Sequence, residues 1–144
     1  PAGDNAFADP VWVAQQAKTQ LTQGADVIFG AGGNTGNGAL QEVAKDAAAG
    51  KDKFCIGVDT DQWDTVPAAQ KCLVTSAMKL ISLGVTDLVT KAKDADFGGL
   101  QSMGKAGLAP YHAFDSVVPA DVKTKVADIV KQMEAGTLQT GVTL

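Results

Sequence analysis

Three short apolar segments, separated by segments with helical spacing, constrain the fold of this chain more than any other feature. The segments are ADVIFGAG at 25–32, FCIGVD at 54–59 and CLVTSAM at 72–78. Each has the length of a strand, and the first is a continuous apolar run of the kind buried on both faces of a parallel sheet. Strands that alternate with helices predict an α/β protein with parallel pairing.

The segments between these strands carry helix signals. Asp9 followed by Pro10 is typical of an N-cap and a first helical residue. Apolar residues recur at helical spacing in four segments. The predicted helices are 10–23, 40–49, 80–92 and 119–135. A short strand is predicted at 108–112, and residues 94–107 have no regular pattern.

Charge and composition exclude several classes of function. The chain has 144 residues, enough for one modest domain, and its net charge of -4 includes twelve lysines and no arginine. The lysines are scattered, whereas nucleic-acid binders cluster Lys and Arg. Bidentate recognition of carboxylate or phosphate also relies on arginine. The sequence therefore favours a neutral ligand, and it contains no apolar run long enough to span a membrane.

The second apolar segment ends in two acidic residues, Asp59 and Asp61. Parallel sheets bind ligands beyond the C-terminal ends of their strands, where Asp59 would lie. Paired carboxylates could perform acid–base chemistry or hold a metal, but no third ligand or nucleophile has suitable spacing. An aspartate can instead accept hydrogen bonds from two hydroxyls of a sugar. A solvated turn is the common alternative; we favour binding for Asp59 and an ordinary turn for Asp61.

The glycine-rich stretch GAGGNTGNG, residues 30–38, matches neither common nucleotide-binding loop. The dinucleotide fingerprint requires a glycine where Thr35 stands, and the phosphate loop requires a lysine where Ala39 stands. A strand-to-helix turn remains, whose backbone N–H groups could approach a ligand closely. A plain tight turn is equally compatible with this sequence.

Five other residues have more than one interpretation. Lys79 ends an apolar strand, so it either reaches solvent or contacts a ligand, and Phe7 in the polar GDNAFADP either stacks on a ligand or packs on the following helix. Cys55 and Cys72 are either small buried core residues or a disulfide in an oxidising compartment. The single histidine, His112, has no partners for a catalytic or zinc site, so packing or surface is expected.

Several motifs, in this order, resemble one protein family. They are AFADP, GADVIFGAGGNTGNGAL, CIGVDTDQ, LVTSAMK and GLAPYH. The sequence resembles the basic membrane protein (BMP) family of ABC-transporter substrate-binding proteins, which are often purine-nucleoside-binding lipoproteins. The resemblance implies a type I periplasmic-binding-protein fold, in which two α/β lobes close on the ligand. It also implies that an N-terminal first lobe, in the same or a separate chain, accompanies this sequence.

The resemblance assigns binding roles to individual residues. Phe7 matches the aromatic residue that stacks on the base, Asp59 the carboxylate that takes the ribose hydroxyls, and Lys79 a lysine at the sugar end. Gly32 and Gly33 match the loop that brings backbone close to the ligand. The family's first-lobe Asp-Asn pair, which reads the base edge, has no counterpart here, so specificity for nucleosides concerns the parent protein.

The resemblance also predicts how the chain divides. Residues 1–72 would form the core of the second lobe. Residues 73–106 would comprise a hinge strand and a helix that packs in the first lobe. Residues 107–144 would return to the second lobe and close it with the final helix.

The expected function is that of a non-catalytic extracytoplasmic binding protein, periplasmic or lipid-anchored, which delivers a nucleoside-like solute to an ABC permease. Neither a cofactor nor a metal is expected. A binding protein for another neutral, sugar-like ligand is one alternative. A small α/β enzyme that uses Asp59 or Asp61 is a second, and an intracellular sensor domain with the same architecture is a third.

Overall fold

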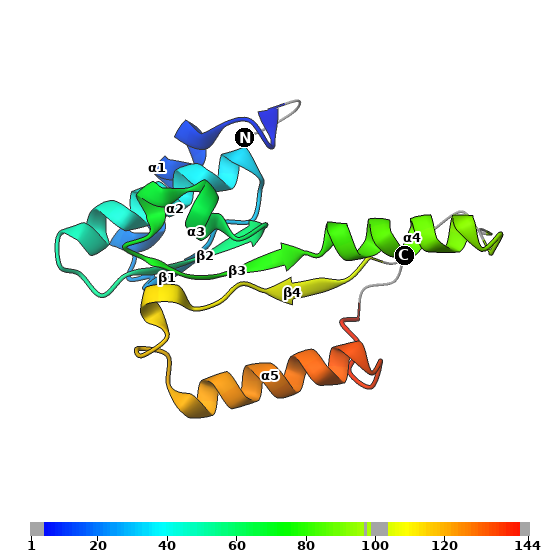
Figure 1. The fold of residues 1–144 in the computed structure, drawn as a ribbon. Coiled ribbons are helices and arrows are strands. Elements are labelled where there is room, and N and C mark those ends of the chain that lie inside the picture. Colours follow the sequence, from blue (N-terminus) through cyan, green and yellow to red (C-terminus); the bar gives the residue numbers. More distant parts are fainter. Residues whose placement is uncertain (1–4, 97, 99–103, 142–144) are drawn as a thin grey trace. The chain divides into compact units, whose positions relative to one another are not determined.

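The structure is a computed structural model that describes residues 5–96, 98 and 104–141. The chain divides into two units, Pro1–His112 and Ala113–Leu144. The first unit contains a sheet with its helices, and the second contains the last helix (Figure 1).

The sheet of the first unit has four strands in the order β1-β2-β3-β4 (Figure 1). The strands are β1 (Val27–Phe29), β2 (Phe54–Asp59), β3 (Leu73–Lys79) and β4 (Ala106–Leu108). The first three are parallel, which confirms the predicted α/β architecture. The fourth strand is antiparallel to β3.

The strand predicted at 108–112 is wrong in its position. Strand β4 ends at Leu108, and a 3-10 turn follows at His112–Phe114. Pro110 has no backbone N–H to donate to a neighbouring strand, so regular pairing ends before it. Of the segment predicted to be irregular, residues 97 and 99–103 lie outside the described residues, and the rest includes the C-cap residue of a helix, Asp94, and the first two residues of β4.

The predicted helices form, with some shifted boundaries. They are α1 (Pro10–Thr22), α2 (Asn34–Ala48), α4 (Ile81–Lys93) and α5 (Ala120–Glu134), with a short α3 (Gln62–Thr65) that the sequence did not predict. Asp9 caps α1, since its Oδ1 accepts from the Trp12 N–H at 2.9 Å. Helix α2 begins inside the glycine-rich stretch, six residues before the predicted start at Leu40.

Two glycines inside α2 allow close packing against neighbouring backbone. A Cβ atom at Gly38 would lie 1.9 Å from the carbonyl oxygen of Pro10, and one at Gly36 would lie 2.1 Å from that of Gly30. The glycines therefore serve helix packing here, a role that the predicted tight turn did not include.

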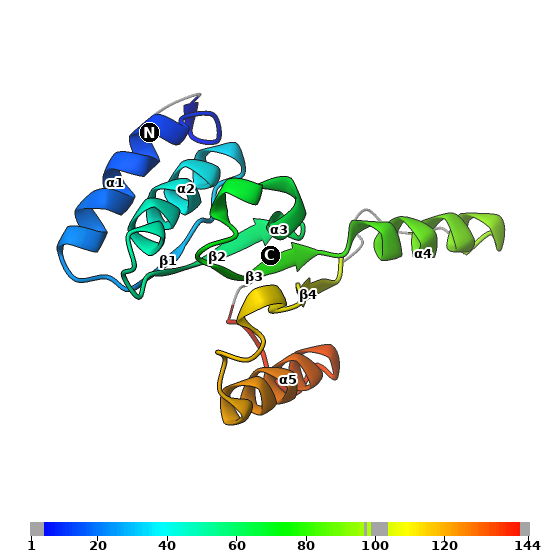
Figure 2. The same cartoon turned by 60° about the vertical axis from the view of Figure 1, so that its left-hand side comes forward.

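The core of the first unit lies between the sheet and the pair α1 and α2, which run side by side (Figures 1 and 2). In β1, Ile28 is buried in this core, whereas the adjacent residues Val27 and Phe29 are 47% and 56% exposed. The prediction that this strand is buried on both faces is therefore wrong for β1 as described, because the helices of its unit cover one face only.

Helix α4 and the second unit expose much apolar surface. No side chain of α4 is buried, although the helix contains four large aliphatic residues that are each more than half exposed: Ile81, Leu83, Val85 and Val89. In the second unit, α5 follows Pro119 as predicted, and its apolar residues Ile129 and Met133 are nearly half exposed. Within the described residues, no helix combines the length and the apolar character that crossing a membrane requires.

Candidate functional site

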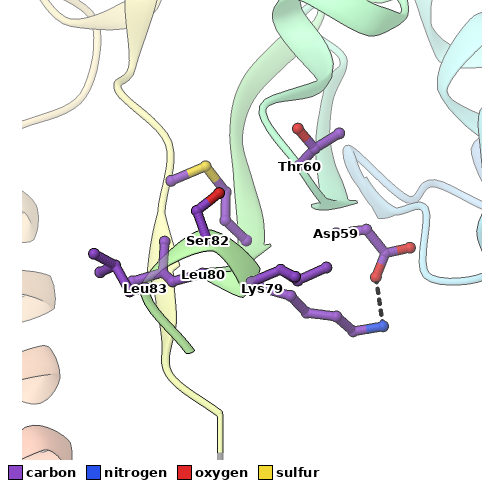
Figure 3. A pocket seen from close by; sticks show the side chains of 8 residues that line it. Asp59, Thr60, Lys79, Leu80, Ser82 and Leu83 are labelled. Atoms are coloured by element: carbon purple, nitrogen blue, oxygen red, sulfur yellow. Dashed lines mark ion pairs between the residues drawn. The ribbon is translucent and has the colours of Figure 1, made fainter. Parts of the chain in front are cut away.

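The candidate site lies at the C-terminal edge of the parallel strands. Asp59 is the last residue of β2, Lys79 is the last residue of β3, and the glycine-rich loop follows β1. Because the three strands are parallel, these groups lie at the same edge of the sheet. An ion pair joins Asp59 Oδ1 to Lys79 Nζ at 2.7 Å (Figure 3). The two side chains are 44% and 71% exposed, so the pair contributes at most about 1 kcal/mol to folding and stays accessible to a ligand.

The backbone of Asp59 adopts a conformation that non-glycine residues rarely use. Its φ angle is +70°, in the left-handed region, where aspartate is tolerated better than most residues. Such conformations cost free energy and concentrate at binding and catalytic sites. The strained turn directs the chain out of β2 and leaves the carboxylate at the edge of the sheet.

An open hollow adjoins the ion pair, with a volume of about 310 Å³. Its lining comes from the ends of β2 and β3 and from the start of α4 (Figure 3). The lining residues are Asp59, Thr60, Met78, Lys79, Leu80, Ile81, Ser82 and Leu83. One wall is therefore charged and the other largely apolar, which suits a ligand with hydroxyl groups and an apolar or aromatic part.

Gln62 supports the turn that carries Asp59, a role that the sequence did not reveal. Its side chain is buried, and its Oε1 accepts from the Val58 N–H at 2.8 Å. Its Nε2 donates to Asn37 Oδ1 at 2.7 Å, and its backbone N–H donates to Ser76 Oγ at 3.1 Å. Gln62 thus connects β2, α2 and β3 directly behind the site. In the sequence, a glutamine just after an acidic turn looks like any polar loop residue. Only its contacts in the folded structure reveal its role.

Asp61 caps a helix and contacts His112, whereas an ordinary solvated turn was expected for it. Its Oδ1 caps α3 by accepting from the Trp63 N–H at 3.1 Å. Its Oδ2 lies 2.8 Å from His112 Nε2, and the imidazole ring stacks on the Trp63 indole with ring centres 4.6 Å apart. His112 therefore packs, as predicted, and holds the segment after β4 against α3. Asp61 is thus engaged with Trp63 and His112, and Asp59 with Lys79.

Phe7 lies beside the glycine-rich loop. Its carbonyl oxygen accepts from the Thr35 N–H at 3.2 Å, and its side chain is 72% exposed. A Cβ atom at Gly33 would lie 4.0 Å from Phe7 Cδ1, so the aromatic ring stands next to that glycine. Gly32 and Gly33 have positive φ angles of 153° and 56°, which favour glycine in this loop. The structure thus forms two groupings among the predicted residues, Phe7 with Gly33 and Asp59 with Lys79.

Replacing Gln62 with alanine is expected to lower the free energy of unfolding by about 2 kcal/mol, because it leaves the partly buried Val58 N–H without its acceptor and Asn37 without its donor. Denaturant titration of the variant and of the original chain measures the difference. Gln41, exposed on α2, provides the matched control, and Gln41→Ala should change the free energy little. Equal effects of the two substitutions would contradict the supporting role of Gln62.

Comparison with known proteins relates the chain to a protein family. The family model described as "ABC transporter substrate-binding protein PnrA-like" (Bmp) matches residues 4–104. Two curated relatives, each called "CD4+ T-cell-stimulating antigen", are 37% identical in Listeria monocytogenes and 36% identical in Listeria innocua. Each match covers 66% of this chain and 29% of the relative, so the chain corresponds to less than a third of their length.

Solved structures are similar to nearly the whole chain. An ABC-transporter solute-binding protein from Aeropyrum pernix is 28% identical with a TM-score of 0.58, covering 95% of this chain and 35% of that one. A solute-binding protein from Conexibacter woesei is 21% identical with a TM-score of 0.67, covering 92% and 43%. A transcriptional activator of the comK gene from Bacillus halodurans is 18% identical with a TM-score of 0.70, covering 96% and 45%. The last two show the fold alone.

Proposed function

The chain belongs to the Bmp family of PnrA-like ABC transporter substrate-binding proteins, and from this premise we propose that it is part of a solute-binding protein that takes a nucleoside-like ligand between two lobes. The protein would act outside the cytoplasm, in the periplasm or lipid-anchored at the membrane, and would deliver its ligand to an ABC permease without changing it chemically.

The exposed carboxylate of Asp59 carries this proposal. It extends from a strained turn at the end of a parallel strand, beside Lys79 and an open hollow. Vicinal hydroxyls of a ribose would donate to the two carboxylate oxygens, and the Lys79 ammonium would donate to an oxygen of the sugar. A neutral sugar requires no arginine, and the chain has none.

The exposed ring of Phe7 supports an aromatic part in the ligand. A phenylalanine that is 72% exposed gains little from burial in the described structure. It stands at Gly33, where the absence of a side chain leaves room beside the ring. A purine base would bury this ring by stacking, which is a favourable arrangement for two aromatic systems.

The exposed surface of α4 supports the proposed division into lobes. We assign residues 1–72 to the core of the second lobe, 73–106 to a hinge strand and a helix that packs in the first lobe, and 107–144 to a return segment with a closing helix. Strand β3 leads directly into α4, and β4 returns antiparallel beside it (Figure 1). Two adjacent connections of this kind would make a hinge. The apolar residues of α4 and α5 would then gain burial against the rest of the protein.

Ligand titration of the full two-lobed protein tests the function. We expect inosine to bind at least 10-fold more tightly than ribose, because ribose has no base to stack on Phe7. Calorimetry measures both affinities, and Phe7→Ala should reduce the difference between them by weakening inosine binding selectively. Ribose binding as tight as inosine binding would favour the sugar-binding alternative. Chemical conversion of inosine, lost in Asp59→Asn, would favour the enzyme.

A further inference from the structure

Cys55 and Cys72 are neighbours through the backbone of the sheet. Cys55 is the second residue of β2, and Cys72 directly precedes β3. The Cys55 N–H donates to the Cys72 carbonyl oxygen at 2.7 Å, and Cys55 stands opposite Leu73 in the parallel register. The pairing of the two strands therefore fixes the two residues side by side, whatever conformations their side chains adopt.

The two side chains also point into the same part of the core. Both residues are completely buried, and their sulfur atoms lie 2.6 Å apart as thiols. Around them are apolar residues of α2 and of the segment before β3, among them Leu40, Val43 and Ala69. Neither sulfur can reach solvent in the folded unit, so each has the other as its only accessible reaction partner among the described residues.

We propose that Cys55 and Cys72 form a disulfide in the exported protein, which links β2 to β3 at the strand ends opposite Asp59 and Lys79. The inference uses the extracytoplasmic location proposed above, where disulfides persist, and it does not depend on which ligand is bound. The bond would hold in register the two strands whose other ends carry the charged pair of the site.

The oxidation requires an external disulfide and proceeds by exchange. One cysteine thiolate attacks a disulfide of an extracytoplasmic thiol–disulfide oxidoreductase and forms a mixed disulfide, and the second thiolate then displaces the oxidoreductase sulfur. The chain loses two electrons and two protons, and the oxidant gains them as a pair of thiols.

Because the two cysteines are buried in the folded protein, the exchange takes place during folding. The contact with the Cys72 sulfur, together with desolvation, raises the pKa of the Cys55 thiol in the folded protein, so little thiolate forms there. The exchange therefore takes place before β2 and β3 close over the two sulfurs. Once formed, the bond is shielded from reductants as long as the protein stays folded.

Trypsin offers a direct test, because Lys71 lies immediately before Cys72. Cleavage after Lys53, Lys71 and Lys79 places the two cysteines in separate peptides, 54–71 and 72–79. The full-length protein is purified after export, alkylated while unfolded without reductant, and digested. We expect the two peptides to be joined, and to separate after reduction. Two separate peptides, each alkylated at its cysteine without prior reduction, would overturn the proposal.

Thermal unfolding tests whether the bond stabilises the fold. The cysteines are seventeen residues apart, and closing a loop of that size restricts the unfolded chain. A reductant present during unfolding is expected to lower the melting temperature by about 10 °C. The double variant Cys55→Ala/Cys72→Ala has no bond to lose, so its melting temperature should be the same with and without reductant. Equal sensitivity of both proteins to reductant would overturn the stabilising role.

Discussion

Replacing Asp59 with asparagine is expected to weaken inosine binding by the two-lobed protein roughly 30- to 100-fold. Asparagine keeps the size of the side chain and tolerates the left-handed backbone, so the turn itself should survive. What is lost is the negative charge. A hydrogen bond to a carboxylate contributes about 1.5–3 kcal/mol, against about 0.5–1.5 kcal/mol for a neutral one, and two sugar hydroxyls would each lose this difference.

Isothermal calorimetry measures this loss, and thermal unfolding checks that the variant is folded. The matched control is Asp52→Asn, which removes the same charge from an exposed position before β2. That control should bind inosine like the original protein. An Asp59→Asn variant that is folded and binds inosine with unchanged affinity would show that Asp59 only shapes the turn, and the proposed contact with the sugar would be abandoned.

Replacing Gly38 with alanine is expected to lower the free energy of unfolding by about 3 kcal/mol. The added Cβ atom would lie 1.9 Å from the carbonyl oxygen of Pro10, and both contacting groups belong to helix backbones. No side-chain rotation can relieve the contact, so α1 and α2 must separate and the core between them must loosen. Phe7 lies three residues before Pro10, so the same displacement should also disturb the aromatic part of the site.

Gly84 provides the control for this experiment. It also lies inside a helix, α4, but a Cβ atom there would contact nothing within 4 Å and its φ is not positive. In the 144-residue chain Gly84→Ala should therefore raise the free energy of unfolding by up to about 1 kcal/mol through helix propensity. Denaturant titration compares the two variants. If the two substitutions change the free energy of unfolding by the same amount, the close approach of α1 and α2 is not a constraint on the fold.

Much of the fold could be predicted because it depends on local spacing. Apolar periodicity identified the four long helices and the three parallel strands, and the pair Asp9 and Pro10 marked the start of α1 correctly. The start of α2 was placed too late, since glycines are poor helix formers and usually indicate a turn. Their close contact with Pro10 and Gly30, which lie on other segments, overrides that preference.

Part of the candidate site could also be predicted from the sequence, and part could not. Asp59 and Lys79 were singled out because both end apolar strands, and parallel pairing then requires them to meet at one edge. Gln62 could not be identified, because its importance depends on Asn37 and Ser76, which are distant in sequence. The stacking of His112 on Trp63 was equally hidden from any local pattern.

The sequence by itself determined the class of fold, the positions of most elements, and the residues that stand at strand ends. These follow from backbone geometry, which repeats every two residues in a strand and every 3.6 in a helix. Only the tertiary structure decided which side chains meet: Asp61 with His112 across 51 positions, Cys55 with Cys72, and Gln62 with its three neighbours. Such contacts depend on strand register and helix packing. These bring together segments that are distant in the chain, and the local sequence of one segment does not indicate which other segment it will contact.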